Sequence, residues 1–484
     1  MPLDVDLLSL ARNLLNNPFT RSILRKLAEE DLHGYRSKLD HALTLIAGES
    51  SKIGISLECI INYKLFKALL TIAFKRMKID EDEFRMVLRD PSFRRGLEIV
   101  FRSLMIYGVT LPQRLCTPFL IVWNFTNACN LKCKHCYQNA STPLPNELSL
   151  EEKLDVLNQL DEIGVPLIAL SGGEPTIHPD FLKIVEEGSK KGIFMAVATN
   201  GIRFSCEDFA EKALRAGLKY VEVSLDSVDP EIHDEIRGVK GAWERTIKGI
   251  RNLVRMNASV GIAMTVNRLN FKEVEEMVKL GEELNVKRVI FFNFIPTGRG
   301  KEIAQLDLTP HQREELLRKV YEMASKSRIQ IASTAPQLAR VSWQMSGGEE
   351  CIPTHFTPSR NYSLRVLAEF IGGCGAGRIY AAIQPDGKVT PCVFLPLIIG
   401  DLRDSKFQDL WNHSPLLRTL RNKNLLKYPC GGCSYKYICG GCRARAYGYF
   451  NDYLAGDPGC LRGLHISLEA EQRIFDIQTT SRIS

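Results

Sequence analysis

The sequence predicts an α/β protein whose centre is a partial (β/α)6 barrel of the TIM type, with a helical domain before it and a cysteine-rich domain after it. Three observations support this prediction. Short apolar runs of strand type alternate with helical patterns from about residue 117 to 300. The first 115 residues have helical spacing of apolar side chains and no cysteine cluster. Seven of the 14 cysteines lie between Cys374 and Cys460.

Residues 1–115 are predicted to form a helical accessory domain. Apolar residues recur there at three- and four-residue spacing, which is typical of amphipathic helices. Asp80 and the pair Asp90-Pro91 are typical helix starts, because aspartate caps the first backbone N–H groups and proline suits the first turn. The sequence leaves open whether this domain docks a partner or supports the fold, and we expect support.

The barrel is predicted over residues 116–305. Its six strands are expected at Phe119–Trp123, Pro166–Leu170, Phe194–Val197, Tyr220–Ser224, Val260–Val266 and Arg288–Phe294. Helical patterns lie between most of them, at Leu150–Ile163, Asp180–Lys191, Cys206–Ala216, Ala242–Met256 and Phe271–Leu284. Strands that alternate with helices predict parallel β/α units, and six units suit an open barrel better than a closed one of eight. The chemistry of such barrels gathers at the carboxyl ends of the strands.

Residues 306–365 are predicted to be a linker, helical at first and then irregular. Turn-forming residues cluster at Ser346–Gly348 and Pro353–Pro358. The linker would join the barrel to a C-terminal domain over residues 366–484.

The composition excludes several classes of protein. A net charge of +7 is mild for 484 residues and is dispersed, so it does not predict nucleic-acid binding. The most apolar stretch, Ile60–Phe74, contains lysines and is too short to span a bilayer. The acidic start M-P-L-D-V-D lacks the basic region of a secretory signal. We therefore expect a cytoplasmic protein without a membrane span, whose clustered cysteines bind metal rather than form disulfides.

Cys129, Cys133 and Cys136 follow the first predicted strand with the spacing C-x3-C-x2-C. A cubane iron–sulfur cluster has four irons, and three thiolates hold only three of them. The fourth iron stays open to bind something else, and an open iron on a low-potential cluster can carry chemistry. A zinc knuckle is the alternative, but zinc usually takes four ligands in two pairs and no fourth ligand completes a pair here. We interpret His135, inside the loop, as a packing residue.

This motif resembles that of the radical SAM enzymes. The resemblance implies that the open iron of a 4Fe–4S cluster binds the amino and carboxylate groups of S-adenosyl-L-methionine. It implies that reductive cleavage then gives a 5′-deoxyadenosyl radical, which removes a hydrogen from the substrate. It also implies anaerobic chemistry and an external low-potential electron donor, a ferredoxin or a flavodoxin.

Further motifs at predicted strand ends match the same family. The run Ser171-Gly172-Gly173-Glu174-Pro175 resembles the element that grips the methionine amino group, and its two glycines would let the backbone approach a ligand closely. By resemblance, Ser224 contacts the ribose, Asp226 lies nearby, and Arg237 pairs with the methionine carboxylate, which a guanidinium can hold with two hydrogen bonds. The implied cofactor-binding residues are Tyr137, Gly172, Gly173, Glu174, Ser224, Asp226 and Arg237. From the residues alone, Ser224 could be a strand-end polar residue and Arg237 a surface arginine.

The tail resembles the SPASM extension, which binds one or two auxiliary iron–sulfur clusters. The resemblance implies two sets of ligands, Cys430, Cys433, Cys439 and Cys460 for one cluster, and Cys374, Cys392 and Cys442 for another. The second set lacks a fourth ligand, so either Cys351 supplies it or an iron stays open. A zinc ribbon is the alternative reading of the paired cysteines. Arg443 and Arg445 either bind substrate carboxylates or support a cluster from behind.

The runs P-C-V-F-L-P and C-G-G-C-R-A-R-A-Y-G-Y-F look most like the tetrapyrrole branch of these enzymes, the NirJ-type and alternative-haem-pathway proteins. The resemblance implies a radical SAM oxidoreductase that modifies a tetrapyrrole side chain, with oxidative decarboxylation as the type of reaction. Maturation of a peptide or protein is the alternative substrate class. A non-catalytic iron–sulfur carrier or scaffold and a zinc-bearing nucleic-acid module are alternatives of other kinds. Val393 follows Cys392 where sulfatase-maturating relatives have aspartate, so that activity is not expected.

Overall fold

The computed structural model describes residues 37–49, 80–353 and 365–464, with a few single positions between 18 and 71. Most of the helical pattern predicted before residue 80 lies outside the described residues, as does most of the turn-rich run Pro353–Pro358.

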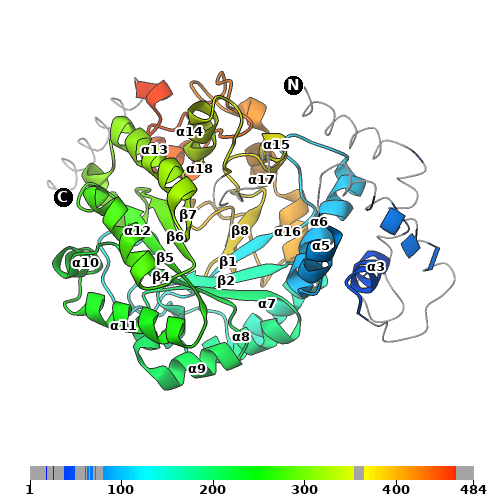
Figure 1. Ribbon diagram of the computed structural model, residues 1–484, viewed down its shortest axis with the longest axis horizontal. Helices are drawn as coiled ribbons and strands as arrows, with labels where there is room; N and C mark the ends of the chain where they lie inside the picture. The colour runs from blue at the N-terminus through cyan, green and yellow to red at the C-terminus, as the bar shows by residue number, and fades with distance from the viewer. Residues whose placement is uncertain are drawn as a thin grey trace.

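The centre of the molecule is one ten-stranded sheet in the order β10-β9-β8-β1-β2-β3-β4-β5-β6-β7. The strands are β1 (Leu120–Thr126), β2 (Leu167–Gly172), β3 (Phe194–Thr199), β4 (Tyr220–Ser224), β5 (Ser259–Val266), β6 (Arg288–Asn293), β7 (Gln330–Ser333), β8 (Tyr380–Ile383), β9 (Lys388–Thr390) and β10 (Gly400–Asp401). Strands β1 to β7 are all parallel to their neighbours, and β8 pairs in parallel with the free edge of β1. The predicted partial β/α barrel is confirmed (Figure 1).

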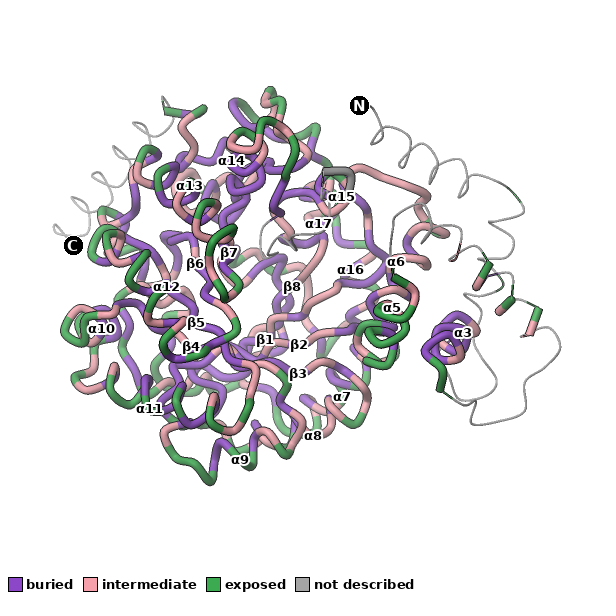
Figure 2. The backbone as a smooth tube through the Cα atoms, viewed as in Figure 1, coloured by how far each residue is buried: buried purple, intermediate pink, exposed green. Residues whose placement is uncertain are grey.

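Helices cover the outer face of the curved sheet (Figure 1). They are α7 (Leu150–Glu162), α8 (Phe181–Lys190), α9 (Glu207–Arg215), α10 (Pro230–Arg237), α11 (Ala242–Arg255), α12 (Val274–Glu283) and α13 (Pro310–Lys326). Helix α7 begins with a capping box, in which Ser149 accepts from the Glu152 N–H and Glu152 accepts from the Ser149 N–H. All of these helices except α10 bury an apolar stripe in the core on the sheet, and Figure 2 shows buried strands inside and exposed helix surfaces outside.

The tail continues the fold with short elements. They are α15 (Arg365–Ile371), α16 (Phe407–His413), α17 (Pro415–Arg421) and α18 (Arg443–Phe450), and α14 (Gln337–Met345) precedes them. Trp411 of α16 is fully buried and donates to the Leu115 carbonyl at 3.1 Å. The Phe407 N–H of the same helix donates to Gln159 of α7 at 3.1 Å, so the tail is packed onto the barrel.

The segment predicted as a linker, residues 306–365, contains α13, β7 and α14, and β7 is a seventh parallel strand of the sheet. The predicted tail domain supplies β8 to the same sheet. Both strands have only four residues, so neither shows an apolar run long enough to be recognised. Pairing with β6 and β1 makes them strands.

The N-terminal segment is helical where it is described, in α3 (Lys38–Ile46), α5 (Glu81–Leu88) and α6 (Pro91–Tyr107). Asp80 and Asp90 cap α5 and α6 as the sequence predicts. Arg95 is 1% exposed and joins α6 to the barrel, since it pairs with Asp161 and donates to the Val165 carbonyl at 3.2 Å. These helices thus support one side of the barrel, on the right in Figure 1.

No helix within the described residues is long and apolar enough to cross a membrane.

Candidate functional site

The loop after β1 brings the first three cysteines together. It closes on itself, because Cys129 N–H donates to the Ser141 carbonyl at 3.0 Å and Ser141 N–H donates to the Asn127 carbonyl at 2.9 Å. Cys129, Cys133 and Cys136 pack around one apolar cluster that includes Leu131. The Leu131 N–H lies 3.4 Å from Cys129 Sγ, a contact that favours a thiolate.

Burial raises the pKa of the Cys129 thiol to about 12, and nearby Glu174, Cys133 and Cys136 add to the effect. A thiol in this place is protonated at neutral pH unless a metal displaces the proton. Among the described residues, no three Cys, His, Asp or Glu side chains lie close enough to hold a single metal ion. A cubane spans a larger space, because each thiolate binds a different iron.

A buried ion pair stands behind the cysteine loop. Helix α10, which the sequence did not reveal, ends at Arg237, and Gly238 closes it with a φ of 70°. Arg237 Nε lies 2.7 Å from Asp226 Oδ2, and Arg237 Nη1 lies 3.7 Å from Cys133 Sγ. Burial alone would raise the pKa of Asp226, but Arg237, two nearby histidines and the Thr265 N–H together outweigh it, and the pKa is lowered. Arg237 is therefore a buried cation beside the cysteines rather than a surface arginine, and Asp226 lies behind it.

The glycine-rich run after β2 is pressed against the cysteine loop. Gly172 has a φ of 113°, and a Cβ there would meet the Thr126 carbonyl at 2.7 Å. A Cβ on Gly173 would meet the Ala128 carbonyl at 2.1 Å. Only glycine fits at either position, and the close approach leaves the backbone of both residues in the wall of the cavity described below.

The Glu174 carboxylate is fully buried and already has donors. It accepts from the Thr176 and Thr199 hydroxyls at 2.6 and 2.7 Å and from the Asn200 N–H at 2.7 Å. Burial raises its pKa in spite of these bonds. The carboxylate therefore fixes the ends of β2 and β3 relative to each other.

Tyr137 and Ser224 both reach the cavity. The Tyr137 hydroxyl lies 2.9 Å from Asn124 Oδ1 and 2.9 Å from Ser171 Oγ, so the ring is fixed over the ends of β1 and β2. Its edge meets the ring of Phe394 with centroids 4.9 Å apart. Phe394 lies two residues after Cys392, so this contact joins the first cysteine loop to the tail.

Arg299 is a site residue whose role the sequence did not define. It donates to the Cys133 carbonyl at 2.9 Å and to the Ala140 carbonyl at 2.9 Å, and it thereby holds the cysteine loop from the end of β6. Gly298 makes this possible, because a Cβ there would lie 2.4 Å from the Cys136 carbonyl oxygen. The sequence feature that could have indicated this role is the run Thr297-Gly298-Arg299 after the sixth predicted strand.

The tail cysteines fall into two groups. We call Cys374, Cys392 and Cys442 the cavity trio, because all three line the cavity and influence one another electrostatically. We call Cys430, Cys433, Cys439 and Cys460 the tail tetrad; three of these influence one another in the same way, and none lines the cavity.

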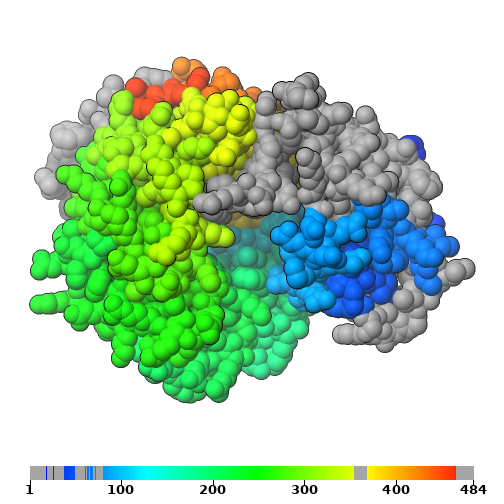
Figure 3. All heavy atoms as spheres, viewed as in Figure 1, coloured from blue at the N-terminus to red at the C-terminus, as the bar shows by residue number. Residues whose placement is uncertain are grey.

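One large cavity of about 1330 Å³ connects the first cysteine loop to the cavity trio. It is bounded by Cys129, Cys133 and Cys136 on one side, by the trio on another, and by the inner faces of β1 to β6. Phe93 and Leu97 of α6 also line it. Figure 3 shows the surface hollowed between the blue N-terminal helices and the yellow-green part of the chain. The volume exceeds the ~300–1,000 Å³ of a typical small-molecule site, so it has room for a cofactor and a substrate together.

Comparisons with known proteins agree with this geometry. Residues 123–281 match the family model of the radical SAM superfamily, and residues 374–434 match that of the SPASM iron–sulfur cluster-binding domain. The chain is 36% identical over 349 residues to a Methanosarcina barkeri protein named AdoMet-dependent heme synthase, and the match covers 71% of this chain and 96% of that protein. The chain belongs to the radical SAM superfamily.

Two further comparisons place this radical SAM enzyme among its relatives. It is 29% identical over 362 residues to the mycofactocin maturase MftC of Mycobacterium tuberculosis, which covers 72% of this chain and 83% of the relative. Its fold matches Streptococcus suis SuiB bound to S-adenosylmethionine with a TM-score of 0.62 at 17% identity, over 87% of this chain and 92% of the other. The likeness to the tetrapyrrole branch is confirmed by the synthases named for haem and pre-haem d1.

Membership in this superfamily sets the cofactors. The enzyme uses a 4Fe–4S cluster and S-adenosyl-L-methionine, and its SPASM domain binds auxiliary iron–sulfur clusters. The alternatives of a non-catalytic scaffold and a zinc-bearing nucleic-acid module are therefore set aside.

The structure decides two choices that the sequence left open in the SPASM region. Arg443 and Arg445 are both 2% exposed, and neither lines the cavity. Arg443 Nη2 lies 3.7 Å from Cys430 Sγ, and Arg445 pairs with Asp307 and Asp457, so both support the tail from behind. Cys351 lies apart from the cavity trio, in an apolar cluster with Ala339, Ala368 and Ile438.

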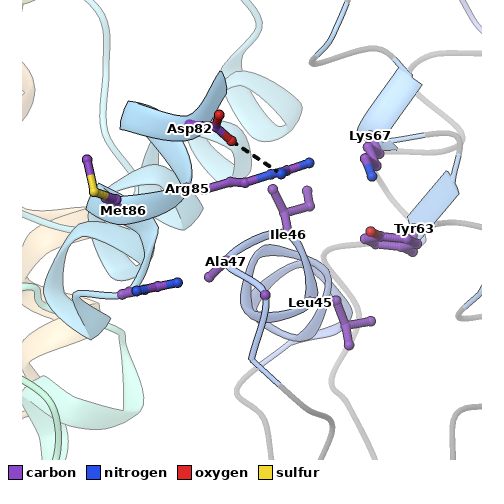
Figure 4. Close-up of a pocket in the computed structure, with 10 residues that line it drawn as sticks. Leu45, Ile46, Ala47, Tyr63, Lys67, Asp82, Arg85 and Met86 are labelled. Atoms are coloured by element: carbon purple, nitrogen blue, oxygen red, sulfur yellow. Dashed lines mark hydrogen bonds and ion pairs between the residues drawn. The ribbon is translucent and has the colours of Figure 1, made fainter. Parts of the chain in front are cut away.

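A smaller cavity of about 430 Å³ lies between α3 and α5, away from the cysteines. Figure 4 shows Arg85 directed at Asp82, with which it forms an ion pair of 3.4 Å, and Lys67 and Tyr63 on the opposite wall. This cavity is formed within the N-terminal helices alone.

Proposed function

We propose that this radical SAM enzyme removes a hydrogen from the propionate side chain of a tetrapyrrole and converts that side chain to a vinyl group with release of carbon dioxide. The observation that carries the proposal is the single cavity that joins Cys129, Cys133 and Cys136 to the cavity trio. A relative named for haem synthesis, matched over nearly its whole length, supports the choice of substrate.

In this proposal, Cys129, Cys133 and Cys136 hold the catalytic cluster at one end of the cavity. When bound, the cluster and S-adenosylmethionine supply the electron and the 5′-deoxyadenosyl group that takes the hydrogen atom. The backbone of Gly172 and Gly173, pressed close by the absence of Cβ atoms, is placed to accept hydrogen bonds from the methionine ammonium group.

The remaining residues would orient the nucleotide. The Arg237 guanidinium is buried beside Cys133, fixed by Asp226, and is suited to the methionine carboxylate. Ser224, at the end of β4, is suited to a ribose hydroxyl, and Tyr137 forms the wall on the side of the tail. Asp226 and Glu174 act through their neighbours, because both are 0% exposed.

Conversion of propionate to vinyl breaks one C–H bond and one bond to the carboxylate. The hydrogen atom goes to 5′-deoxyadenosine, carbon dioxide leaves, and one electron must leave the substrate. The cavity trio faces the substrate space and would hold an auxiliary cluster, which would supply an electron acceptor there. A ferredoxin or flavodoxin would supply the electron that starts each turnover.

The experiment combines the anaerobically reconstituted full chain with S-adenosylmethionine, reduced flavodoxin and iron coproporphyrin III. We expect 5′-deoxyadenosine and a porphyrin that has lost carbon dioxide and two hydrogens per propionate, detected by mass spectrometry. Deuterium at the propionate carbon next to the ring should appear in 5′-deoxyadenosine. Formation of 5′-deoxyadenosine with an unchanged porphyrin would reject the tetrapyrrole as substrate.

Maturation of a peptide is the second candidate, and the match to a mycofactocin maturase favours it. This candidate predicts that the cavity binds no porphyrin and that a short precursor peptide raises 5′-deoxyadenosine formation. Transfer of deuterium from a labelled peptide, in place of the porphyrin, would establish it. A gene for such a peptide beside this one would point the same way.

A further inference from the structure

The inner wall of the barrel carries polar side chains well below the proposed cofactor residues. Register pairs put one residue from each strand in a row across the sheet, namely Ala198, Glu222, Gly261, Arg288 and Gln330. On β4, Val221 and Val223 pack into the core, whereas Tyr220, Glu222 and Ser224 line the cavity. Glu222 and Arg288 therefore face the cavity on either side of Gly261.

Gly261 makes room for a third polar group in this row. A Cβ at Gly261 would lie 1.9 Å from the Tyr220 hydroxyl oxygen, so that hydroxyl occupies the space a side chain would fill. The hydroxyl thus lies between Glu222 and Arg288. We call Tyr220, Glu222 and Arg288 the lumen floor.

The polar groups of the lumen floor have few partners of their own. The Tyr220 hydroxyl is buried and makes no hydrogen bond of good geometry to the described residues, although the Arg288 guanidinium is its neighbour, 6.0 Å from the centre of its ring. Arg288 Nε donates to Gln330 at 3.2 Å, and Arg288 also lines the cavity. A buried hydroxyl without a partner costs about 1–3 kcal/mol, and a ligand would remove that cost.

The wall around the lumen floor is lined by small side chains. Ala169, Ala196 and Ala198 of β2 and β3 face the cavity in register with Tyr220 and Glu222, and Ala263 of β5 faces it in register with Ser224. Barrel interiors are normally filled by branched residues such as valine, isoleucine and leucine. Alanines therefore leave open the space beside the lumen floor.

We propose that the lumen floor binds a carboxylate of the substrate other than the one that reacts. This inference rests on the proposed function, because a tetrapyrrole with several propionates brings several carboxylates. Arg288 supplies a planar fork suited to a carboxylate, and the Tyr220 hydroxyl supplies a further donor. Lys287 lines the cavity next to Arg288 and adds positive charge.

The distance along β4 allows one carboxylate to bind at the lumen floor while another part of the substrate reaches the proposed nucleotide site. Ser224 lies two residues beyond Glu222 on the same face, which separates their Cα atoms by about 7 Å at ~3.3 Å per residue. One carboxylate on the lumen floor would leave another part of the substrate at the strand ends, beside the proposed nucleotide site. Burial raises the pKa of Glu222 to about 7, so a large fraction of this carboxyl is neutral near pH 7 and can donate as well.

The test is an anaerobic absorbance titration of the reconstituted full chain with iron coproporphyrin III. We expect Arg288→Gln to weaken binding at least tenfold and Arg288→Lys to weaken it less, because lysine keeps the charge but not the fork. Tyr220→Phe removes only the hydroxyl and should weaken binding about threefold. Arg215→Gln, on the exposed face of α9, is the matched control and should bind as the wild type does. Iron content and circular dichroism identify any variant that does not fold, and Tyr220→Phe keeps the test valid if Arg288→Gln is one of them.

The two possible failures are distinct. If the wild type binds iron coproporphyrin III and both Arg288→Gln and Tyr220→Phe bind it equally well, the lumen floor is not a carboxylate site, and the proposed function is unaffected. If the wild type binds no porphyrin, the tetrapyrrole substrate is rejected and the assignment of the lumen floor is rejected with it.

Discussion

The cavity trio and the tail tetrad are built from the same residue type within one domain, but they face different surroundings. The trio lines the substrate-sized cavity, and Tyr380 donates to Cys392 Sγ at 3.0 Å from the cavity wall. The tetrad lies behind the trio, where Arg443 reaches Cys430 Sγ at 3.7 Å. Three ligands at the cavity would leave one iron of a cubane without a thiolate, whereas four ligands would close it.

This difference shows that the role of each cysteine group depends on where the group lies in the fold and not on its residue type. A cluster at the cavity can exchange an electron with a substrate or contact it. A fully ligated cluster behind it can carry electrons or stabilise the tail. The predictions below test this contrast between a cavity-facing group and an enclosed one.

The largest effect is expected from removing one ligand of each group. Cys392→Ala and Cys433→Ala should each lower the iron content by about four irons per chain. Cys392→Ala should also abolish product formation while 5′-deoxyadenosine still forms, because the catalytic cysteines are intact. Cys433→Ala should retain measurable product. Iron analysis and product assays on both variants check this, and equal loss of product in the two would remove the functional contrast.

Asp457 is the point where the two groups meet, and its substitution should affect both. Its Oδ2 accepts from the Cys442 N–H and from Gln337 at 2.7 Å each, and its own N–H lies 3.5 Å from Cys430 Sγ. Asp457→Asn removes the charge that faces Arg445, so we expect a loss of about 1–3 kcal/mol of stability and of iron from both groups.

The control for this variant is Asp404→Asn, on the exposed turn after β10, which should keep full iron content. Iron analysis in combination with Cys392→Ala separates the groups. If Asp457→Asn lowers the iron content of the wild type but not that of Cys392→Ala, Asp457 serves the trio alone.

Much of this arrangement could be predicted from the sequence, because it depends on local patterns. The six strands and five helices of the barrel are confirmed, with differences of up to three residues at their ends. The division of the tail cysteines followed from a family resemblance, and the structure groups the trio in the same way. Strands β7 and β8 were missed, because a strand of four residues is too short to show a recognisable pattern of apolar residues.

The parts of the site that could not be predicted depend on contacts between distant segments. Asp226 was expected near the ribose, and the structure adds a contact that the sequence did not indicate, a buried ion pair with Arg237. The lumen floor requires the register of β4, β5 and β6 as well as a missing side chain at Gly261. Nothing in the chain near Arg288 indicates that its neighbours across the sheet are polar.

A smaller effect is expected at the hydrogen bond that only the trio has from the cavity wall. Tyr380→Phe removes the donor to Cys392, and a hydrogen bond to a cluster sulfur favours the reduced, more negative state. A net bond energy of about 0.5–1.5 kcal/mol corresponds to a fall in potential of roughly 20–60 mV for one electron. Redox titration followed by electron paramagnetic resonance checks this. Tyr428→Phe, at an exposed position, is the control, and a shift in the signal of a different cluster would contradict the assignment.

The smallest effect concerns the pKa values of two carboxyls, Glu222 in the cavity wall and Asp307 in an enclosed network of ion pairs. Glu222 faces the cavity, and burial raises its pKa from 4.5 to about 7, with Arg288 opposing the rise. Asp307 is enclosed, and although burial would raise its pKa, Arg445 and Arg313 outweigh that and lower it. The folded protein therefore holds a proton on Glu222 that the unfolded chain releases above about pH 4.5, so this group lowers stability as the pH rises from about 4.5 to about 7. Asp307 acts in the opposite sense, because its contribution to stability is lost only as the pH falls.

Glu222→Gln should remove the loss of stability that Glu222 causes as the pH rises, and it should leave the contribution of Asp307 unchanged. We expect the melting temperature of Glu222→Gln to equal that of the wild type at pH 5 and to exceed it by about 1–3 °C at pH 8. Glu231→Gln, at the exposed start of α10, is the control and should show no such divergence. Melting curves of the reconstituted chain at both pH values measure the difference. If the difference in melting temperature between Glu222→Gln and the wild type is the same at pH 5 and pH 8, Glu222 titrates normally. The carboxyl at the cavity wall would then be as well solvated as one on the surface.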